Sequence, residues 1–166
     1  TPPAGWTLVR RMDNASGIAN SLAVYFRVTV AGEPASHTWT FSASTGSAGG
    51  ISAFSGVDTS SPVDVENGQN TAVSLTQSTP SVTTTTARAM LVTSHAFSSC
   101  ANWTPPAGMT EAFEAASNAV PNSAGMSMEG SYVLQAAIGV TGVKSAVASN
   151  DADSGNAHIL ALRQAP

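Results

Sequence analysis

Histidine and serine side chains are the first candidates for chemistry in this chain. Nucleophilic catalysis needs a Ser or Cys within hydrogen-bond reach of a His that a carboxylate orients. The sequence has 23 serines and three histidines, which are His37, His95 and His158. Ser55 lacks the glycines of a nucleophile elbow, because Ala53 and Val57 occupy those positions. With so many serines, chance proximity to a His is the better explanation, and we expect no acyl-transfer chemistry.

Two pairs of carboxylates have the residue types of the acid and base of a glycoside hydrolase. They are Glu111 with Glu114, and Asp58 with Asp64. Neither pair has a distinctive sequence context. Asp58 opens a stretch rich in Ser and Pro, which is typical of a turn that an Asp side chain caps. A hydrolase of unrecognised type is therefore the weakest of the functions considered.

The segment 150–156 places oxygen-bearing side chains near a glycine that allows a tight turn. Asp151, Asp153 and Asn156 are the candidate ligands for a hard cation such as Ca²⁺. The segment lacks the distal bidentate Glu of an EF-hand, so an ordinary solvated turn is the alternative interpretation. The histidines lack the close spacing of zinc ligands, and we expect no zinc.

Aromatic side chains could stack on sugar rings. Trp103 lies in a polar stretch outside the alternating pattern of a strand, and together with Asn102 and Tyr132 it forms the candidate ligand site. Trp39 has apolar neighbours at alternate positions and is predicted to pack in the core. Cys100 is the only cysteine, so an intrachain disulfide is excluded; we expect a small buried side chain, with an intermolecular partner as the alternative.

The composition of the 166 residues predicts one domain spanning 1–166 and excludes several partners. Charged residues make up only 10% and the net charge is −4, so a phosphate-binding basic stripe is lacking and nucleic acid is a poor partner. No apolar run approaches the roughly 18 residues of a membrane span. The polar but uncharged composition, rich in Ser and Thr, is typical of β proteins that are extracellular, secreted or on a virion surface.

Alternation of apolar and polar residues is the dominant pattern and predicts β-strands. The predicted strands span residues 6–11, 22–30, 37–41, 51–57, 72–76, 82–86, 90–97, 109–113, 131–137, 140–147 and 157–163. Turn-forming clusters separate them, among them 58–62 and 67–70, and 111–118 is expected to be strand followed by loop. The spacing predicts an all-β, antiparallel two-sheet sandwich of the jelly-roll type.

One motif occurs twice: TPPAGWT at residues 1–7 returns as TPPAGMT at residues 104–110. In each copy, prolines stiffen the approach and a glycine permits an unusual turn before a strand begins. The copies are interpreted as the same loop-to-strand device at equivalent corners of a sandwich. A pair of ligand-binding loops is the alternative.

Several segments resemble a module of bacterial surface and secreted proteins and of phage virion proteins. They are PPAGWTLVRR at 2–11, LAVYFRV at 22–28, EPASHTWTFS at 33–42, GGISAFSGVDTSSPVDV at 49–65, WTPPAGMTE at 103–111 and LALR at 160–163. The resemblance covers nearly the whole chain in order. It implies a jelly-roll-like module without catalytic chemistry, and it does not imply one ligand.

Two departures from that module are informative. Such modules usually carry strand-forming sequence before the PPAGW segment, so we expect an open sheet edge that a neighbouring subunit or a cleaved segment fills; a trimmed or shorter variant is the alternative. His37 replaces the expected Tyr and is predicted to be a partly buried, hydrogen-bonded ring.

The sequence therefore predicts a non-enzymatic structural or adhesive subunit, such as a decoration, fibre or appendage component on a virion or bacterial surface. The expected partners are copies of itself or neighbouring structural proteins. A carbohydrate-binding module that recognises cell-surface glycan is the alternative. No cofactor is expected apart from the calcium considered above.

Overall fold

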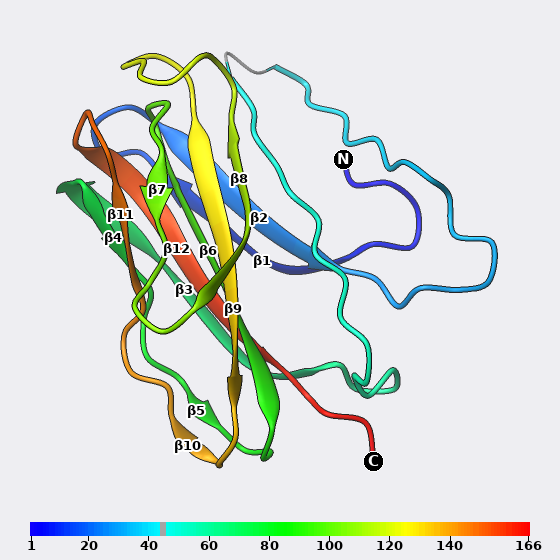
Figure 1. Ribbon diagram of the computed structural model, residues 1–166. Coiled ribbons are helices and arrows are strands. Elements are labelled where there is room, and N and C mark those ends of the chain that lie inside the picture. Colours follow the sequence, from blue (N-terminus) through cyan, green and yellow to red (C-terminus); the bar gives the residue numbers. More distant parts are fainter. Residues whose placement is uncertain (44–45) are drawn as a thin grey trace.

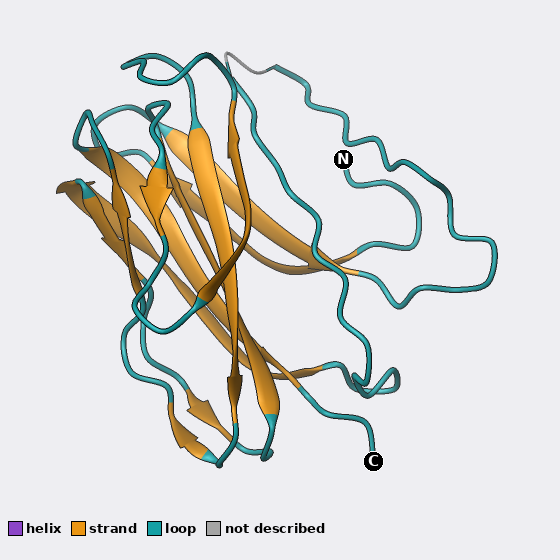
Figure 2. Cartoon of the chain, in the orientation of Figure 1, coloured by secondary structure: helices purple, strands orange, loops and turns teal. Residues whose placement is uncertain are grey.

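The structure is a computed structural model that describes residues 1–43 and 46–166. Every regular element in these residues is a β-strand, and all strand pairs are antiparallel (Figure 1, Figure 2). The predicted all-β antiparallel class is confirmed. The described residues include no helix long and apolar enough to cross a membrane.

A five-stranded sheet forms the centre of the molecule. Its strand order is β3 (Val63–Ser74), β12 (Asp153–Leu162), β6 (Ala89–Phe97), β9 (Ser127–Gln135) and β8 (Thr110–Ala116). The central strand β12 is buried on both faces over most of its length, whereas β6 has one buried face and one face on which Met90, Val92 and Ser94 are only half-buried. The sheet therefore has two faces to cover.

A hairpin covers part of the first face. It consists of β1 (Thr7–Asn14) and β2 (Asn20–Phe26), which form a separate two-stranded sheet. Met12 and Leu22 of the hairpin pack against Ala96 and Met128 of the main sheet, so that the alternation in β1 and β2 puts their apolar side inward.

Short strands cover the second face. β4 (Thr76–Ser78), β11 (Ser145–Ala148) and β7 (Trp103–Thr104) form a three-stranded sheet. Phe97 and Trp103 meet there edge to face, with ring centroids 4.8 Å apart, over Ala146 and Ala148. At one end of the molecule β5 (Thr83–Thr84) pairs with β10 (Gly139–Val140) (Figure 1).

The repeated motif forms the same turn twice. Gly5 and Gly108 both have positive φ, +83° and +78°, which glycine adopts without steric cost. In each copy the next backbone N–H donates to the carbonyl of the second proline, with distances of 3.4 Å and 3.0 Å. The chain then enters β1 or β8, as expected for a shared loop-to-strand device.

Several sequence expectations about strands and turns are wrong. Residues 37–41 and 51–57 were expected to be strands, but both lie in the long connection between β2 and β3, which runs outside the sheets (Figure 2). Residues 67–70 were expected to be a turn and instead lie within β3. Gly68 is needed there because a Cβ would stand 2.2 Å from the sulfur of Met12, so the hairpin lies directly on this strand.

Candidate functional site

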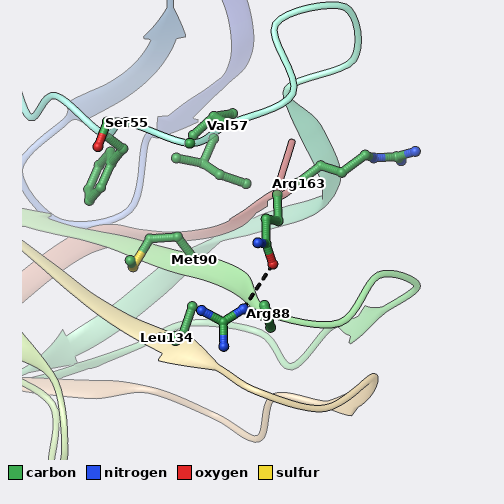
Figure 3. A pocket seen from close by; sticks show the side chains of 10 residues that line it. Ser55, Val57, Arg88, Met90, Leu134 and Arg163 are labelled. Atoms are coloured by element: carbon green, nitrogen blue, oxygen red, sulfur yellow. Dashed lines mark hydrogen bonds between the residues drawn. The ribbon is translucent and has the colours of Figure 1, made fainter. Parts of the chain in front are cut away.

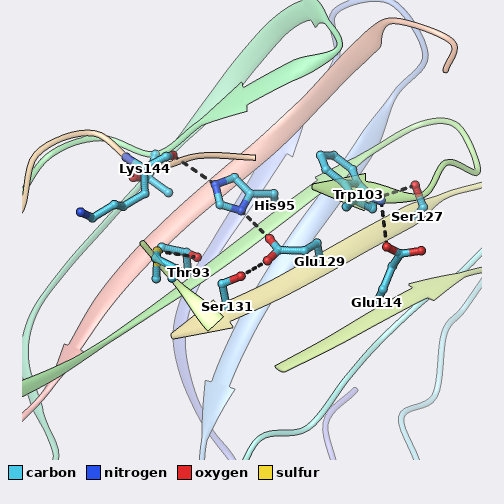
Figure 4. Close-up of polar contacts among 10 residues, drawn as sticks. Thr93, His95, Trp103, Glu114, Ser127, Glu129, Ser131 and Lys144 are labelled. Atoms are coloured by element: carbon cyan, nitrogen blue, oxygen red, sulfur yellow. Dashed lines mark hydrogen bonds and ion pairs between the residues drawn. The ribbon is translucent and has the colours of Figure 1, made fainter. Parts of the chain in front are cut away.

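A fully buried polar cluster joins β6 to β9 on the face covered by the short strands (Figure 4). His95 and Glu129 are paired residues of the two strands, and the His95 Nδ1 lies 2.9 Å from Glu129 Oε2. The Ser131 hydroxyl donates to the other carboxylate oxygen. His95 Nε2 donates to the carbonyl of Lys144 at 3.2 Å, so both ring nitrogens are engaged.

The order of contacts in this cluster differs from that of a nucleophilic triad. A triad places the hydroxyl on the imidazole and the carboxylate behind it. Here Ser131 contacts the carboxylate, the second imidazole nitrogen is held by a backbone carbonyl, and His95 and Glu129 have no exposed surface. The arrangement ties two strands and the approach to β11 together rather than presenting a nucleophile to substrate.

A second polar cluster fastens the hairpin to the main sheet. Arg10 of β1 donates through Nε and a terminal nitrogen to the two oxygens of Glu66 on β3, at 2.8 Å and 2.9 Å. His158 of β12 contacts the same carboxylate at 3.0 Å. Hydrogen bonding from Arg10, and then from His158, lowers the pKa of Glu66 despite partial burial. Burial lowers the pKa of His158 and outweighs the favourable contact with Glu66.

Asp58 and Asp64, which were considered as an acid and base, have separate hydrogen-bond partners. Asp58 caps the predicted turn, accepting from the N–H groups of Ser60 at 2.9 Å and Ser61 at 3.3 Å. Asp64 accepts a hydrogen bond from the backbone N–H of Thr85. Asp58 and Asp64 therefore have different hydrogen-bond partners.

Glu111 and Glu114 also have different surroundings. Glu114 accepts from the backbone N–H of Trp103 at 2.8 Å. Glu111 lines an open cavity, and desolvation, followed by the charges of Glu114 and Glu129, raises its pKa. A raised pKa of one exposed carboxyl group does not by itself make a catalytic pair, because glycoside hydrolysis needs two carboxyl groups that face each other.

The aromatic residues near the N-terminus form a cluster outside the main sheet. Trp6 lies edge-on to His37 and Trp39, with centroids 5.1 Å and 5.0 Å away, and Tyr25 adjoins Trp39. The Trp6 indole N–H donates to His37 Nδ1 at 3.2 Å. The predicted hydrogen-bonded, partly buried His37 is confirmed, whereas Trp39 is half-buried in this cluster rather than in the central core.

The predicted ligand residues Trp103, Asn102 and Tyr132 do not form one surface. Trp103 is only 6% exposed, and its indole N–H donates to Ser127 at 3.1 Å (Figure 4). Asn102 is exposed beside it, while Tyr132 is half-buried and stacks edge-on against Phe54, 5.7 Å away. Exposure of Trp103 was thus wrongly expected, because its packing partners are distant in sequence.

The predicted calcium ligands have separate hydrogen-bond partners. Asp151 is exposed and accepts from Asn150, while Asp153 accepts from Ser99 and from the N–H of Ser154. Asn156 is buried and donates to Asn70 on β3 at 2.8 Å. Within 1–43 and 46–166, no group of three or more His, Cys, Asp or Glu is placed to hold a metal ion. Cys100 is buried, as expected.

An open groove lies on the first face of the main sheet, in the part that the hairpin does not cover. This groove was not predicted from the sequence. One cavity of about 340 Å³ is lined by Phe54, Val57, Met90, Leu134 and Leu162, among others, and Figure 3 shows Val57 across from Met90 and Leu134. A second cavity, of about 450 Å³, extends past Phe54 to other residues of the same face. The available signal was the predicted strand 51–57, whose only described backbone pairing is the isolated bridge of Val57 with Gln164.

The hairpin leaves a free strand edge on this same face. β2 pairs with β1 on one side, and no described strand pairs with its other side. An unpaired edge presents N–H and C=O groups that another strand can bond. We use the name "β2 groove" for the part of this face that holds the free edge of β2 and the two cavities, which are lined by the segment 51–57 and by Met90, Tyr132, Leu134 and Leu162 rather than by β2 itself.

Comparisons with protein-family models, with curated proteins and with solved structures found no match to this chain. The geometry of the β2 groove and of the polar clusters therefore carries the functional argument.

Proposed function

We propose that this protein is a non-enzymatic structural or adhesive subunit of a virion or bacterial surface. In this proposal it is a two-sheet, jelly-roll-like sandwich whose second sheet is completed when subunits assemble. The observation that carries the proposal is the unpaired edge of β2, on the same face of the main sheet as the two open cavities. Such an edge is a binding surface for β-strand addition, in which main-chain hydrogen bonds supply affinity.

The surface chemistry supports assembly. Only 10% of the residues are charged, and several charged side chains are already used within the subunit, as in the Arg10–Glu66 pair. Burying such a surface against a neighbour requires little desolvation of charge. Ser and Thr hydroxyls adapt to a neighbouring polar surface by rotation.

The solution mass and thermal melt of residues 1–166 test this proposal. We expect light scattering to show oligomers or filaments that grow with concentration, together with a low melting temperature at the monomer mass. A cooperative melt at the monomer mass over the whole concentration range would contradict the assembly role.

A carbohydrate-binding role is the second candidate, and the aromatic cluster favours it. Trp6, Tyr25 and Trp39 are each half-buried and have polar neighbours in Arg27 and Glu33, which form an ion pair at 2.8 Å. A glycan array would show reproducible binding that Trp39→Ala abolishes. Trp103→Ala is the comparison variant, because its buried ring cannot act as a stacking platform in this structure.

A further inference from the structure

The smaller of the two cavities combines an apolar lining with positive charge. We call it the Arg88 cavity, because Arg88 lies at its rim together with Arg163, and no Asp or Glu is among its lining residues. Its apolar side chains are Phe54, Val57, Met90, Leu134 and Leu162. The volume of about 340 Å³ is large enough for a small molecule, since ligand pockets measure about 300–1,000 Å³.

Arg88 is the arginine whose charge has no carboxylate partner among the described residues. The other four arginines of the chain form ion pairs with N–O distances between 2.8 Å and 3.3 Å; they are Arg10, Arg11, Arg27 and Arg163. Arg88 instead donates through Nε to the uncharged amide oxygen of Gln164 at 3.0 Å. The N–H groups of its two terminal nitrogens are therefore left for a ligand.

The two arginines of the cavity are oriented differently (Figure 3). The side chain of Arg163 points away from Val57 and Met90, and one terminal nitrogen lies 3.3 Å from Asp64. The guanidinium of Arg88 lies beside Leu134, on the same side of the cavity as Met90. A ligand in the cavity would therefore meet the charge of Arg88 with apolar side chains around it.

The backbone at Arg88 is in a conformation that side chains rarely adopt. Its φ is +54°, and Asp151 is the one other non-glycine residue with positive φ in the described part of the chain. A side chain at such a position has a steric cost, and residues of this kind gather at ligand sites. The backbone N–H of Arg88 donates to Ala136 at 3.1 Å, so this turn is fixed where β6 begins beside the end of β9.

We propose that the Arg88 cavity binds an aliphatic carboxylate, a small molecule with one carboxylate group and an unbranched apolar chain. The terminal nitrogens of Arg88 donate to the two carboxylate oxygens, a planar pairing for which guanidinium is suited. The apolar chain lies over Met90, Leu134 and Leu162 and is removed from water.

The charge of the cavity selects this class of ligand. One guanidinium matches the single charge of a carboxylate, whereas the second charge of a phosphate would have no partner. An uncharged alkyl chain would cover the guanidinium without pairing it, which costs desolvation. The inference goes beyond the proposed assembly role and does not rest on it, because one subunit supplies the whole cavity.

Methyl NMR with decanoate as the probe tests this inference. The full 166-residue chain carries carbon-13 in its methionine methyl groups, and sodium decanoate is added below its micelle concentration. We expect a saturable shift of the Met90 methyl signal with one equivalent bound. Met109 is the internal control, because its sulfur contacts Thr93 outside the cavity lining, and its signal should stay in place.

Two further probes separate the charge from the chain. Decanol has the same chain without the charge, and acetate has the charge without the chain. We expect each to bind at least about tenfold more weakly than decanoate, because each loses one of the two contacts. This comparison uses the unaltered protein, so it does not depend on the folding of any variant.

Protein variants locate the binding to Arg88. Arg88→Gln removes the charge, and we expect the dissociation constant for decanoate to rise about tenfold or more. Arg11→Gln is the matched control: it makes the same change in net charge at an exposed arginine of β1 that pairs with Asp13, and affinity should be unchanged. Circular dichroism of both variants confirms that the fold is retained.

The outcomes separate this inference from the assembly role. A saturable Met90 shift that is weakened by Arg88→Gln and not by Arg11→Gln supports it. Equal affinities for decanoate and decanol overturn it, as does equal weakening by the two arginine variants, which would assign the attraction to net charge. An unmoved Met90 signal also overturns it and leaves the assembly role intact. A stable monomer contradicts the assembly role alone.

Discussion

The two hairpins of this protein have the same register and the same bulge but different surroundings. In both β1 and β8 the bulge follows the second residue of the strand, so the two hairpins can be compared residue by residue. β8–β9 is part of the main sheet, because β9 also pairs with β6. On the face of β9 that the short strands cover, Glu129 is buried against His95. β1–β2 stands alone, and the residue that corresponds to Glu129 is Ala23, which is exposed. The same local strand design thus serves as part of a closed core in one half and as an open edge in the other.

The inner sides of the hairpins differ in how they are anchored. The bulge of β8 is followed by Phe113, whose ring packs on the flat surface of Gly130. The corresponding residue of β1 is Arg10, which is anchored by the Glu66 carboxylate. A polar anchor holds an edge hairpin without adding apolar surface to it, so we infer that the first hairpin is the more easily released.

Removing the buried carboxylate should have the largest effect. Glu129→Ala gives the second hairpin the alanine that the first hairpin has at the corresponding position, Ala23. The change leaves His95 and Ser131 buried without the carboxylate that both contact. We expect a loss of about 3–5 kcal/mol in the free energy of unfolding, measured by chemical denaturation.

The matched control for this variant is Ala23→Glu, which adds the carboxylate to the exposed position of the first hairpin. Its free energy of unfolding should change by about 0.5 kcal/mol or less. Equal effects of the two variants would show that the buried cluster has no special role in stability.

Filling the space beneath Phe113 should have an intermediate effect. Gly130→Val again copies the first hairpin, where Val24 stands at this position. A Cβ on Gly130 would lie 2.4 Å from the Phe113 ring, so we expect a loss of about 1–3 kcal/mol. Adding Phe113→Ala should relieve the clash, and a double-mutant cycle measures the coupling. Strictly additive losses would mean that the ring and the glycine do not constrain each other.

Acidification should release the first hairpin before the second. The lowered pKa of Glu66 means that its stabilising contribution is complete above the ordinary value of 4.5 and is lost as pH falls through the lowered value. The lowered pKa of His158 acts in the same direction, because protonation favours the unfolded chain as pH falls below 6.5. We expect amides of β1 and β2 to lose exchange protection at acid pH, after correction for intrinsic rates, while β8 and β9 stay protected.

Glu66→Gln is the control for this experiment. It removes the titrating carboxyl, so the first hairpin should be less stable at neutral pH and its protection should depend less on pH. The same acid-induced loss in wild type and Glu66→Gln would place the titration elsewhere.

The residue patterns predicted which segments of the chain are extended better than they predicted which of these segments pair in a sheet. Alternation located β6 almost to the residue, since 90–97 was expected and Ala89–Phe97 is observed. It also predicted a strand at 51–57, where the chain forms no ladder. A strand needs a partner as well as a propensity, and the partner is set by contacts between distant segments.

The candidate site was less predictable for a related reason. Trp103 stands in a polar stretch, yet it is buried by Phe97 and by Ser127 from a different strand. The β2 groove is defined by a missing neighbour, and no short sequence window reveals that. The repeated TPPAG motif was the useful signal, because it identified two equivalent corners whose surroundings could then be compared.

The place of β12 has a consequence for synthesis of the chain on the ribosome. β12 is made after both β3 and β6, but it lies between them in the main sheet, joined to them across gaps such as the 86 residues between Asn156 and Asn70. Until β12 emerges, the edges of β3 and β6 that it will pair with keep unpaired N–H and C=O groups, which favours aggregation. Production of the protein should therefore respond strongly to chaperones that hold nascent chains and to slower translation of the β12 segment.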